Sequence, residues 1–273
     1  MGARQLIAEG REAEIFAWEP GRVLKLYRSP SDTARAEWEE AATAAVAGAG
    51  GPAPRPFGLV SVDGRPGLVL ERVDGVDLVV TMGRRPWTVP SAGTAMGRAH
   101  AALHGISAPD SLSGTRAMLE RRIRGADAPV AWRDAALHLL ERLPDGDRLS
   151  HNDLHAQNVL LTERGAVVID WPGATRGDPA ADVARSLLLF AVGKPLPSTP
   201  LRVRVLAPPA TSVFRRRYLA AYRGVRPLDE AAVRSWLLPH AIARLVEGIP
   251  GERARLERLV RRLLRRASRP GGY

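Results

Sequence analysis

The sequence predicts an α+β protein in two lobes: a small antiparallel-sheet lobe over residues 1–73 and a larger, mainly helical lobe over residues 74–273. Short runs of β-branched and aromatic residues, separated by Pro-Gly and Asp-Gly turns, are concentrated in the first quarter of the chain. Helical patterns occupy most of the remainder. The chain has 273 residues, of which 45% are hydrophobic, so it can bury a full core.

Two hairpins and one helix are expected in the first lobe. The strands IFAW and VLKLY flank the turn EPGR within residues 15–27. A helix follows over residues 31–47, and Ser31 or Asp32 can cap its N-terminus. After the Gly- and Pro-rich loop at residues 48–56, the turn DGRPG joins FGLVSV to LVLERV. The sheet lobe ends after this second hairpin.

Seven helices and one further hairpin are expected in the second lobe. The helices are predicted over residues 91–106, 115–124, 130–143, 179–192, 210–223, 229–247 and 252–267. The hairpin is NVLLTERGAVVID, with TERG as its loop. Its register pairs Val159 with Val168 and Asn158 with Ile169, and Asp170 lies one step further. Asn158 and Asp170 therefore meet at the open end of the hairpin.

This open end has the composition of a metal-and-base site. A carboxylate and an amide oxygen at one place commonly hold Mg²⁺. His151, Asp153 and Asn158 form the pattern H-x-D-x-x-x-x-N, which is the spacing of a kinase catalytic loop. In that loop the Asp accepts the proton of an attacking hydroxyl and the Asn binds Mg²⁺. The spacing and the hairpin register agree, which favours one site over three unrelated loop residues.

A phosphate-binding cation is expected on the first hairpin. The pattern G-x-x-x-x-G-K-[ST] does not occur in the sequence, which excludes a P-loop enzyme. Lys25 lies in VLKLY and is one of two lysines in a chain that otherwise uses Arg. Glu37 and Glu40 share one face of the following helix and are candidate partners for it. Gly10, in EGREAEIF, lies where a phosphate-covering turn would be.

The chain resembles the aminoglycoside phosphotransferase and choline kinase group, small-molecule relatives of the protein kinases. The resemblance covers nearly all of the chain, and its most specific segments are SHNDLHAQNVLL, VVIDW and GDPAADVARSL. It implies a bilobal protein-kinase-like fold with ATP, or GTP, and Mg²⁺ in the cleft. It also implies that Asp153 is the catalytic base and that Asn158 and Asp170 are the metal ligands. The family often has Gly where this chain has Asn152.

The same resemblance implies roles for residues outside the catalytic loop. Lys25 would hold the α- and β-phosphates, with Glu37 as its partner. The Glu71 carbonyl and the Val73 amide would meet the adenine. Asp182, in GDPAAD, would brace the catalytic loop from the following helix.

The expected acceptor is a hydroxyl group of a small molecule: an antibiotic, a sugar or an amino alcohol. Only seven residues separate Asp170 from Asp178, whereas a protein kinase has a much longer segment there to dock peptides. Residues 201–273, which are expected to wall the acceptor site, hold 17 Arg against five acidic residues, a local charge of +12. This charge counts against a polycationic aminoglycoside, although the pocket could still gather Asp178, Glu230 and Glu247. A nucleic-acid partner is not expected, because no DNA-reading motif accompanies the basic end.

Two other functions stay open. His155 gives the sequence HNDLH, which is compatible with a metal-dependent hydrolase built on His151, Asp153 and His155. A kinase-like binding protein without activity is the other alternative. The sequence has no Cys, and its longest apolar run, SLLLFAV, is too short to cross a bilayer. We expect a cytoplasmic protein with no membrane partner, either a monomer or a weak dimer.

Overall fold

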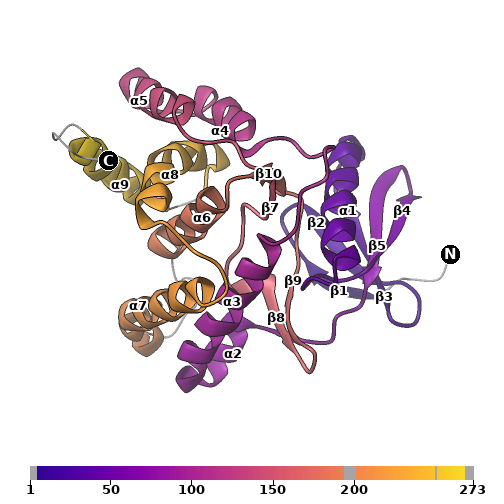
Figure 1. Ribbon diagram of the computed structural model, residues 1–273. Coiled ribbons are helices and arrows are strands. Elements are labelled where there is room, and N and C mark those ends of the chain that lie inside the picture. Colours follow the sequence, from indigo (N-terminus) through magenta and orange to yellow (C-terminus); the bar gives the residue numbers. More distant parts are fainter. Residues whose placement is uncertain (1–4, 194–200, 250, 268–273) are drawn as a thin grey trace.

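The computed structural model describes residues 5–193, 201–249 and 251–267. It has the predicted α+β architecture, with an antiparallel sheet at one end of the molecule and most of the helices at the other (Figure 1). Within the described residues, no helix combines the length and the apolar character needed to span a bilayer. The first sheet ends at Glu71, and the division of the chain after residue 73 stays a prediction.

The first sheet has five strands in the order β1–β2–β3–β5–β4, with every neighbouring pair antiparallel. The strands are β1 (Leu6–Glu9), β2 (Ala13–Ala17), β3 (Arg22–Tyr27), β4 (Pro56–Val62) and β5 (Arg65–Glu71). The predicted hairpins are β2–β3 and β4–β5. β1 was not predicted: all four of its residues are exposed, so it lacks the alternation of buried and exposed residues that marks a half-buried strand.

Helix α1 (Thr33–Gly48) contacts β4 and β5 through residues that recur every three or four positions. A 3₁₀ turn over Pro30–Asp32 precedes it. The capping residue is Ser29, whose hydroxyl accepts the N–H of Ser31 at 3.2 Å. Ser29 caps this turn, whereas Asp32 is the N-cap residue of α1, as one of the two predictions had it; its side chain makes no capping hydrogen bond to α1 and instead accepts the N–H of Ser29 at 3.3 Å. The predicted cap Ser31 is wrong. The helical turns begin earlier because proline favours the first position of a helix, where its missing N–H costs nothing.

The chain enters the helical lobe through a short strand that pairs with the catalytic hairpin. β6 (Val76–Asp77) pairs with β8 (Val159–Thr162), and β8 pairs with β9 (Gly165–Val168). The register of β8 and β9 is the predicted one, with Val159 opposite Val168. A Cβ atom on Gly75 would lie 2.9 Å from the Leu161 carbonyl oxygen, so this close crossing requires glycine.

The second lobe contains most of the helices. They are α2 (Leu78–Arg84), α3 (Val89–Leu103), α4 (Thr115–Arg124), α5 (Val130–Glu141), α6 (Pro179–Val192), α7 (Leu201–Arg223), α8 (Glu230–Ala243) and α9 (Arg253–Ala267). α4 and α6 have the predicted bounds. α2 was missed because its seven residues are too few to show a helical period, and Val79 and Val80 are exposed.

Helices α3 and α7 pack very closely because α3 presents glycines to α7. A Cβ atom on Gly97 would lie 2.3 Å from the Tyr218 carbonyl oxygen, and one on Gly93 would lie 2.6 Å from the Phe214 carbonyl oxygen. Any larger residue would push the two helices apart. This close packing brings the histidines of α3 next to the tyrosines of α7.

Candidate active site

The loop over residues 151–158 is held by one carboxylate from helix α6. It follows β7 (Arg148–Ser150), which pairs with β10 (Thr175–Gly177). The N–H groups of His151 and Asn152 donate to the two carboxylate oxygens of Asp182, at 2.5 and 2.8 Å. The predicted bracing role of Asp182 is confirmed by these contacts.

Asn152 gives this loop its sharp turn. Its φ is 59°, in the left-handed region, which Asn tolerates better than most non-glycine residues. Its side-chain amide donates to the Gly173 carbonyl at 3.2 Å and to the Thr175 hydroxyl at 2.6 Å. Asn therefore supplies the backbone conformation of a glycine at this position and adds two hydrogen bonds that fix the loop.

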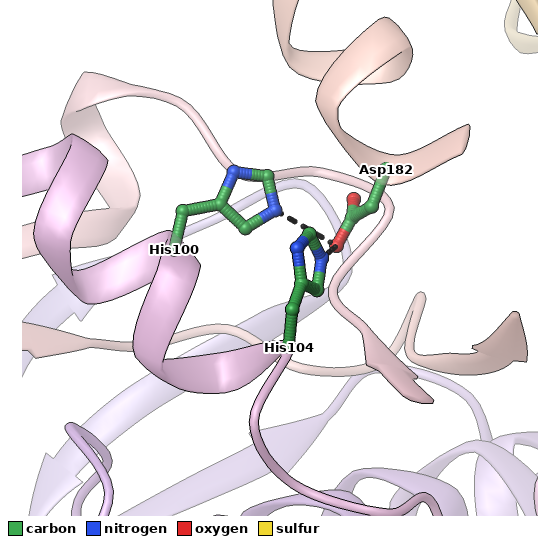
Figure 2. Close-up of side chains that lie close together, drawn as sticks. All are labelled: His100, His104 and Asp182. Carbon is green, nitrogen blue, oxygen red and sulfur yellow. Dashed lines mark hydrogen bonds and ion pairs between the residues drawn. The ribbon is translucent and has the colours of Figure 1, made fainter. Parts of the chain in front are cut away.

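Asp182 is itself surrounded by buried polar groups (Figure 2). The Nε2 atoms of His100 and His104, both on α3, lie 3.1 and 3.3 Å from its carboxylate. On their other ring nitrogens, His100 Nδ1 is 2.7 Å from the Tyr218 hydroxyl and His104 Nδ1 is 2.6 Å from the Tyr222 hydroxyl. A hydrogen-bonded chain thus runs from α7 through α3 to the catalytic loop.

His100, His104 and Asp182 are also close enough together to hold a metal ion, but His104 is hydrogen-bonded at both ring nitrogens, to Asp182 and to Tyr222. Burial, and after it the charge of His100, lower the pKa of His104 to about 4, so it is neutral at pH 7. A neutral imidazole can donate from Nε2 to the carboxylate and accept a tyrosine hydroxyl at Nδ1. We therefore interpret this cluster as structural. Sequence analysis missed its role, for which the only signal was two histidines four residues apart in HAALH.

Asp153 extends from this loop toward two arginines and a histidine. Its carboxylate lies 3.3 Å from Arg185 Nη2, 3.6 Å from His155 Nε2 and 4.0 Å from Arg244 Nη1. Burial raises the pKa of Asp153, but the hydrogen bond with His155 and the charge of Arg185 outweigh it and hold the pKa well below its ordinary value. The carboxylate is therefore ionised at neutral pH.

His151 does not join Asp153 and His155 in a metal-binding cluster. Its Nε2 lies 3.1 Å from the Ile169 carbonyl, and its Nδ1 accepts the N–H of Asp153 at 3.2 Å. The ring is fully buried, with its centroid 4.6 Å from that of Trp171. Both ring nitrogens are engaged inside the protein, so the hydrolase alternative loses one of its three ligands.

Across the cleft, Lys25 forms a buried ion-pair network. Its Nζ lies 2.7 Å from Glu39 of α1 and 2.5 Å from Asp170. Glu39 also accepts the N–H of Trp171 at 3.1 Å and pairs with the Tyr27 hydroxyl. Burial lowers the pKa of Lys25, but the charges of Glu39 and Asp170 outweigh it, so the pKa is raised and the ammonium stays charged.

The predicted partner of Lys25, Glu37, is wrong. Glu37 is exposed, whereas Glu39 is 1% exposed and lies on the buried face of α1 with Ala36 and Thr43. Two positions along an α-helix correspond to about 200°, so Glu37 and Glu39 point in nearly opposite directions. The alignment of Glu39 with the small and apolar stripe of α1 was the sequence signal that could have identified it.

Asn158 and Asp170 are arranged as a pair of cation ligands would be. Asn158 is buried, and its amide N–H donates to the Asp153 carbonyl at 3.1 Å, which leaves its side-chain oxygen for a cation. Asp170 has φ 70°, and its half-exposed carboxylate uses one oxygen for Lys25. Both side chains line the same cleft, and two such oxygens with water and phosphate suit Mg²⁺. These two residues therefore fit the metal.

A cleft of about 1780 Å³ joins these groups and is lined by both lobes. Gly10 lies in the turn between β1 and β2, and its N–H donates to the Ala13 carbonyl at 2.9 Å. Glu71 and Val73 line the cleft where the two lobes connect. The Glu71 side chain is paired with Arg164 at 2.5 Å. The nucleotide contacts of Gly10, Glu71 and Val73 stay predictions.

The helical wall of the cleft carries three arginines that sequence analysis did not single out, together with Glu247, which it named as a candidate for the acceptor pocket. Arg122, Arg185 and Arg244 all contact Glu247, which lies in the 3₁₀ turn after α8. They come from separate helical segments of the second lobe, so no local spacing in the sequence relates them. Their convergence depends on how these segments pack.

Comparisons with solved structures show the same fold. Aminoglycoside phosphotransferase APH(4)-Ia, in a ternary complex with ADP and hygromycin B, matches with 18% identity and a TM-score of 0.64, over 95% of this chain and 94% of that one. A putative fructosamine-3-kinase from Haemophilus somnus 129PT matches with 14% identity and a TM-score of 0.63, over 95% and 90%. The GDP and kanamycin complex of APH(2")-IIIa matches with 17% identity and a TM-score of 0.56, over 97% and 92%. No match was found among curated proteins.

A sheet lobe with a Lys–Glu pair, facing a helical lobe with an H-x-D-x-x-x-x-N loop and a following Asp, defines a kinase-like phosphotransferase. The model of the phosphotransferase enzyme family matches residues 4–236. This match covers most of the chain, so the protein belongs to that family. The predicted resemblance and the predicted enzyme class are both confirmed.

Proposed function

We propose that the protein transfers the γ-phosphoryl group of ATP to a hydroxyl group of a small molecule, in a reaction that requires Mg²⁺. The observation that carries this proposal is the position of Lys25, which is paired with Glu39 and Asp170 across the cleft from Asp153. Related structures with ADP or GDP and an aminoglycoside support a nucleotide and a small acceptor. GTP is the alternative donor, and we propose that the protein acts in the cytoplasm as a monomer or a weak dimer.

Each group in the cleft has a distinct part in the reaction. Lys25 orients the α- and β-phosphates, and its ion pairs hold the ammonium in place. Asn158 and Asp170 hold Mg²⁺, which would neutralise charge on the phosphates. The acceptor oxygen forms a bond to the γ-phosphorus while the bond to the bridging oxygen of ATP breaks, and ADP leaves. The hydroxyl proton passes to Asp153 or to solvent.

Asp153 acts mainly by orienting the acceptor. Its pKa is held well below the ordinary value, because the effects of His155 and Arg185 outweigh that of burial, so it is a weak base. Phosphoryl transfer passes through a loose transition state in which the attacking oxygen keeps its proton until late. An ionised, well-fixed carboxylate suits this reaction, because positioning contributes more to the rate than early proton removal.

The short connection after Asp170 favours a small acceptor over a protein. β10 begins at Thr175 and α6 begins at Pro179, so the chain returns at once to regular structure. The N-cap of α6 is Asp178, whose carboxylate accepts the N–H of Ala180 at 2.8 Å. No segment between Asp170 and α6 is long enough to bind an extended peptide.

Thermal unfolding with nucleotide and metal tests the nucleotide site. ATP and Mg²⁺ together, at about 100 times the dissociation constant, should stabilise the protein by about 2.7 kcal/mol. Asp170→Ala should weaken this effect, because it removes a metal ligand. Asp134→Ala, at an exposed site on α5 outside the cleft, is the matched control and should leave the effect intact. Stabilisation by Zn²⁺ alone, with none from ATP and Mg²⁺, would instead support the hydrolase.

A further inference from the structure

Three arginines converge on one carboxylate beside Asp153. The nearest Glu247 oxygen lies 3.3 Å from Arg122 and 2.7 Å from Arg185, and Arg244 also contacts this carboxylate. All of these side chains line the cleft on the side of the helical lobe. Because Asp153 is expected to meet the acceptor hydroxyl, this cluster forms the adjoining wall of the acceptor site.

Two of the three guanidinium groups are mostly buried, and each makes three hydrogen bonds with the protein. Arg185 is 5% exposed; its Nε donates to the Asn152 carbonyl at 2.9 Å, and its Nη2 donates to Asp153 and Glu247. Arg244 is 10% exposed, and its Nε and Nη2 donate to Glu252 at 2.9 and 3.1 Å. These two arginines therefore fix the shape of the wall and direct most of their hydrogen bonds to protein groups.

Arg122 differs from both. Its side chain is 37% exposed, and among the described residues only its Nη1 has a partner, Glu247. Burial, and then the charge of Arg185, lower the pKa of Arg122 even though Glu247 raises it. The positive charge of Arg122 is therefore only partly balanced by Glu247, and a further negative charge next to it would be favourable.

The same cluster disfavours a cationic acceptor. Glu247 is already shared by three arginines, and Asp153 lies beside Arg185 and near Arg244. An ammonium group entering this wall would meet guanidinium groups before it met a carboxylate without a partner. Such a juxtaposition of like charges is a strong means of rejecting a ligand.

We propose that the acceptor is a small hydroxyl compound with an anionic group, a carboxylate or a phosphate, and that Arg122 binds this group while the hydroxyl faces Asp153. The planar fork of arginine suits both anions. Contacts of 3.3, 2.7 and 3.3 Å lead from Asp153 through Arg185 and Glu247 to Arg122, so one small molecule can reach both ends. This inference rests on the proposed phosphotransferase function.

Two matched series of acceptors test the charge preference. The first is glycerate, glycerol 3-phosphate, glycerol and 3-amino-1,2-propanediol; the second is gluconate, glucose 6-phosphate, glucose and glucosamine. ADP formation with ATP and Mg²⁺ gives kcat/KM for each compound, and mass spectrometry identifies the phosphorylated product. We expect an anionic member to have the highest kcat/KM, and the carboxylates and phosphates show which anion is preferred. A neutral or cationic compound in first place, or no turnover of any anionic member, would overturn the inference.

Arg122→Gln tests the residue itself. Loss of a charge-assisted hydrogen bond should raise KM for the preferred anionic acceptor by about 10- to 100-fold, with a much smaller change in kcat. Arg121→Gln, at the exposed neighbouring position on α4, removes the same charge outside the cleft and should leave KM unchanged. An unchanged KM in Arg122→Gln would overturn the inference. Absence of stabilisation by ATP and Mg²⁺ in the unaltered protein would instead overturn the proposed function.

Discussion

Asp153 is held in place by its backbone and kept charged by its neighbours. The adjacent Asn152 donates its N–H to Asp182, and Asn158 donates to the Asp153 carbonyl at 3.1 Å. Arg185 lies 3.3 Å from the carboxylate and is itself fixed by the Asn152 carbonyl. A fixed, ionised carboxylate at the acceptor end of the cleft is what the proposed reaction needs.

Replacing Asp153 with Asn should abolish most of the turnover without removing nucleotide binding. We expect kcat to fall by about 10²- to 10⁴-fold, because an amide lacks the negative charge that orients the acceptor hydroxyl and takes up its proton late in the reaction. The dissociation constant for ATP with Mg²⁺ should change little, since Lys25, Asn158 and Asp170 are untouched. Steady-state kinetics and calorimetric titration measure the two quantities. A fully active variant would show that Asp153 is not the base.

The part of the site that was predicted correctly is the register of β8 and β9, whose geometry is local; the catalytic and metal-binding roles of the residues beside it stay predictions. The H-x-D-x-x-x-x-N spacing and the two-residue period of the hairpin place Asp153, Asn158 and Asp170 without knowledge of any distant segment. Arg122 could not be placed in this way, because it lies far along the chain from Arg244 and Glu247, which share the 3₁₀ turn after α8, and it reaches Glu247 through the packing of α4 against that turn.

Helix α1 shows how a correct element can still give a wrong residue. Its bounds were predicted to within about two residues, yet the partner of Lys25 was assigned to Glu37 instead of Glu39. The helix was assumed to turn Glu37 and Glu40 toward the sheet. The small and apolar residues of α1 show which face is buried, and Glu39 lies on that face.

A matched pair of variants on α1 tests this correction. Glu39→Gln should weaken the binding of ATP and lower turnover by at least about 10-fold, because Lys25 loses the carboxylate that orients it. Glu37→Gln removes the same charge from the same helix and should leave both quantities unchanged. Calorimetric titration with ATP and Mg²⁺ measures the binding. Equal effects of the two variants would show that the Lys25–Glu39 pair has no functional part.

The cluster of helices α3, α6 and α7 joins the core of the helical lobe to the catalytic loop. Gly97 allows α7 to come close, and the tyrosines of α7 then fix the histidines that contact Asp182. Sequence analysis predicted α3 and the end of α7 but not their closeness. The glycines of α3 predict close helix packing only when the helix that packs against them is known.

At the scale of the whole molecule, buried neutral histidines make stability depend on pH. Burial is the first cause in both cases and lowers the pKa of His104 to about 4 and that of His240 to about 3. In the unfolded chain both would titrate near pH 6.5. Below that pH the unfolded state binds more protons than the folded state, so stability is full above about pH 6.5 and falls as the pH decreases.

Between pH 7.5 and pH 5, protonation of each of these two histidines in the unfolded state should lower the free energy of unfolding by about 2 kcal/mol. Urea denaturation at the two pH values measures the loss. His138→Gln is the control, because His138 is exposed and its removal should leave the pH dependence unchanged. Stability that stays constant or increases toward pH 5 would contradict the buried, neutral state of His104 and His240.

The two lobes also contribute different residues to the candidate active site. The sheet lobe supplies Lys25 and Glu39, and the helical lobe supplies Asp153, Asn158 and Asp170. Sequence analysis predicted this division because the change from strand patterns to helix patterns is visible along the chain. It also predicted that the Arg-rich residues 201–273 wall the acceptor site, but not that Arg122 and Arg185, from earlier helices, join this wall, because that depends on the tertiary packing of the helical lobe.

Phosphorus NMR of a reaction with ATP, Mg²⁺ and the preferred acceptor tests the central claim most directly. We predict that a phosphomonoester resonance grows in equal amount with ADP, and that it is absent without Mg²⁺ and strongly reduced in Asp153→Asn. Release of inorganic phosphate with no phosphomonoester, or an equal rate in Asp153→Asn, would contradict the assignment of a phosphotransferase that acts on a hydroxyl group.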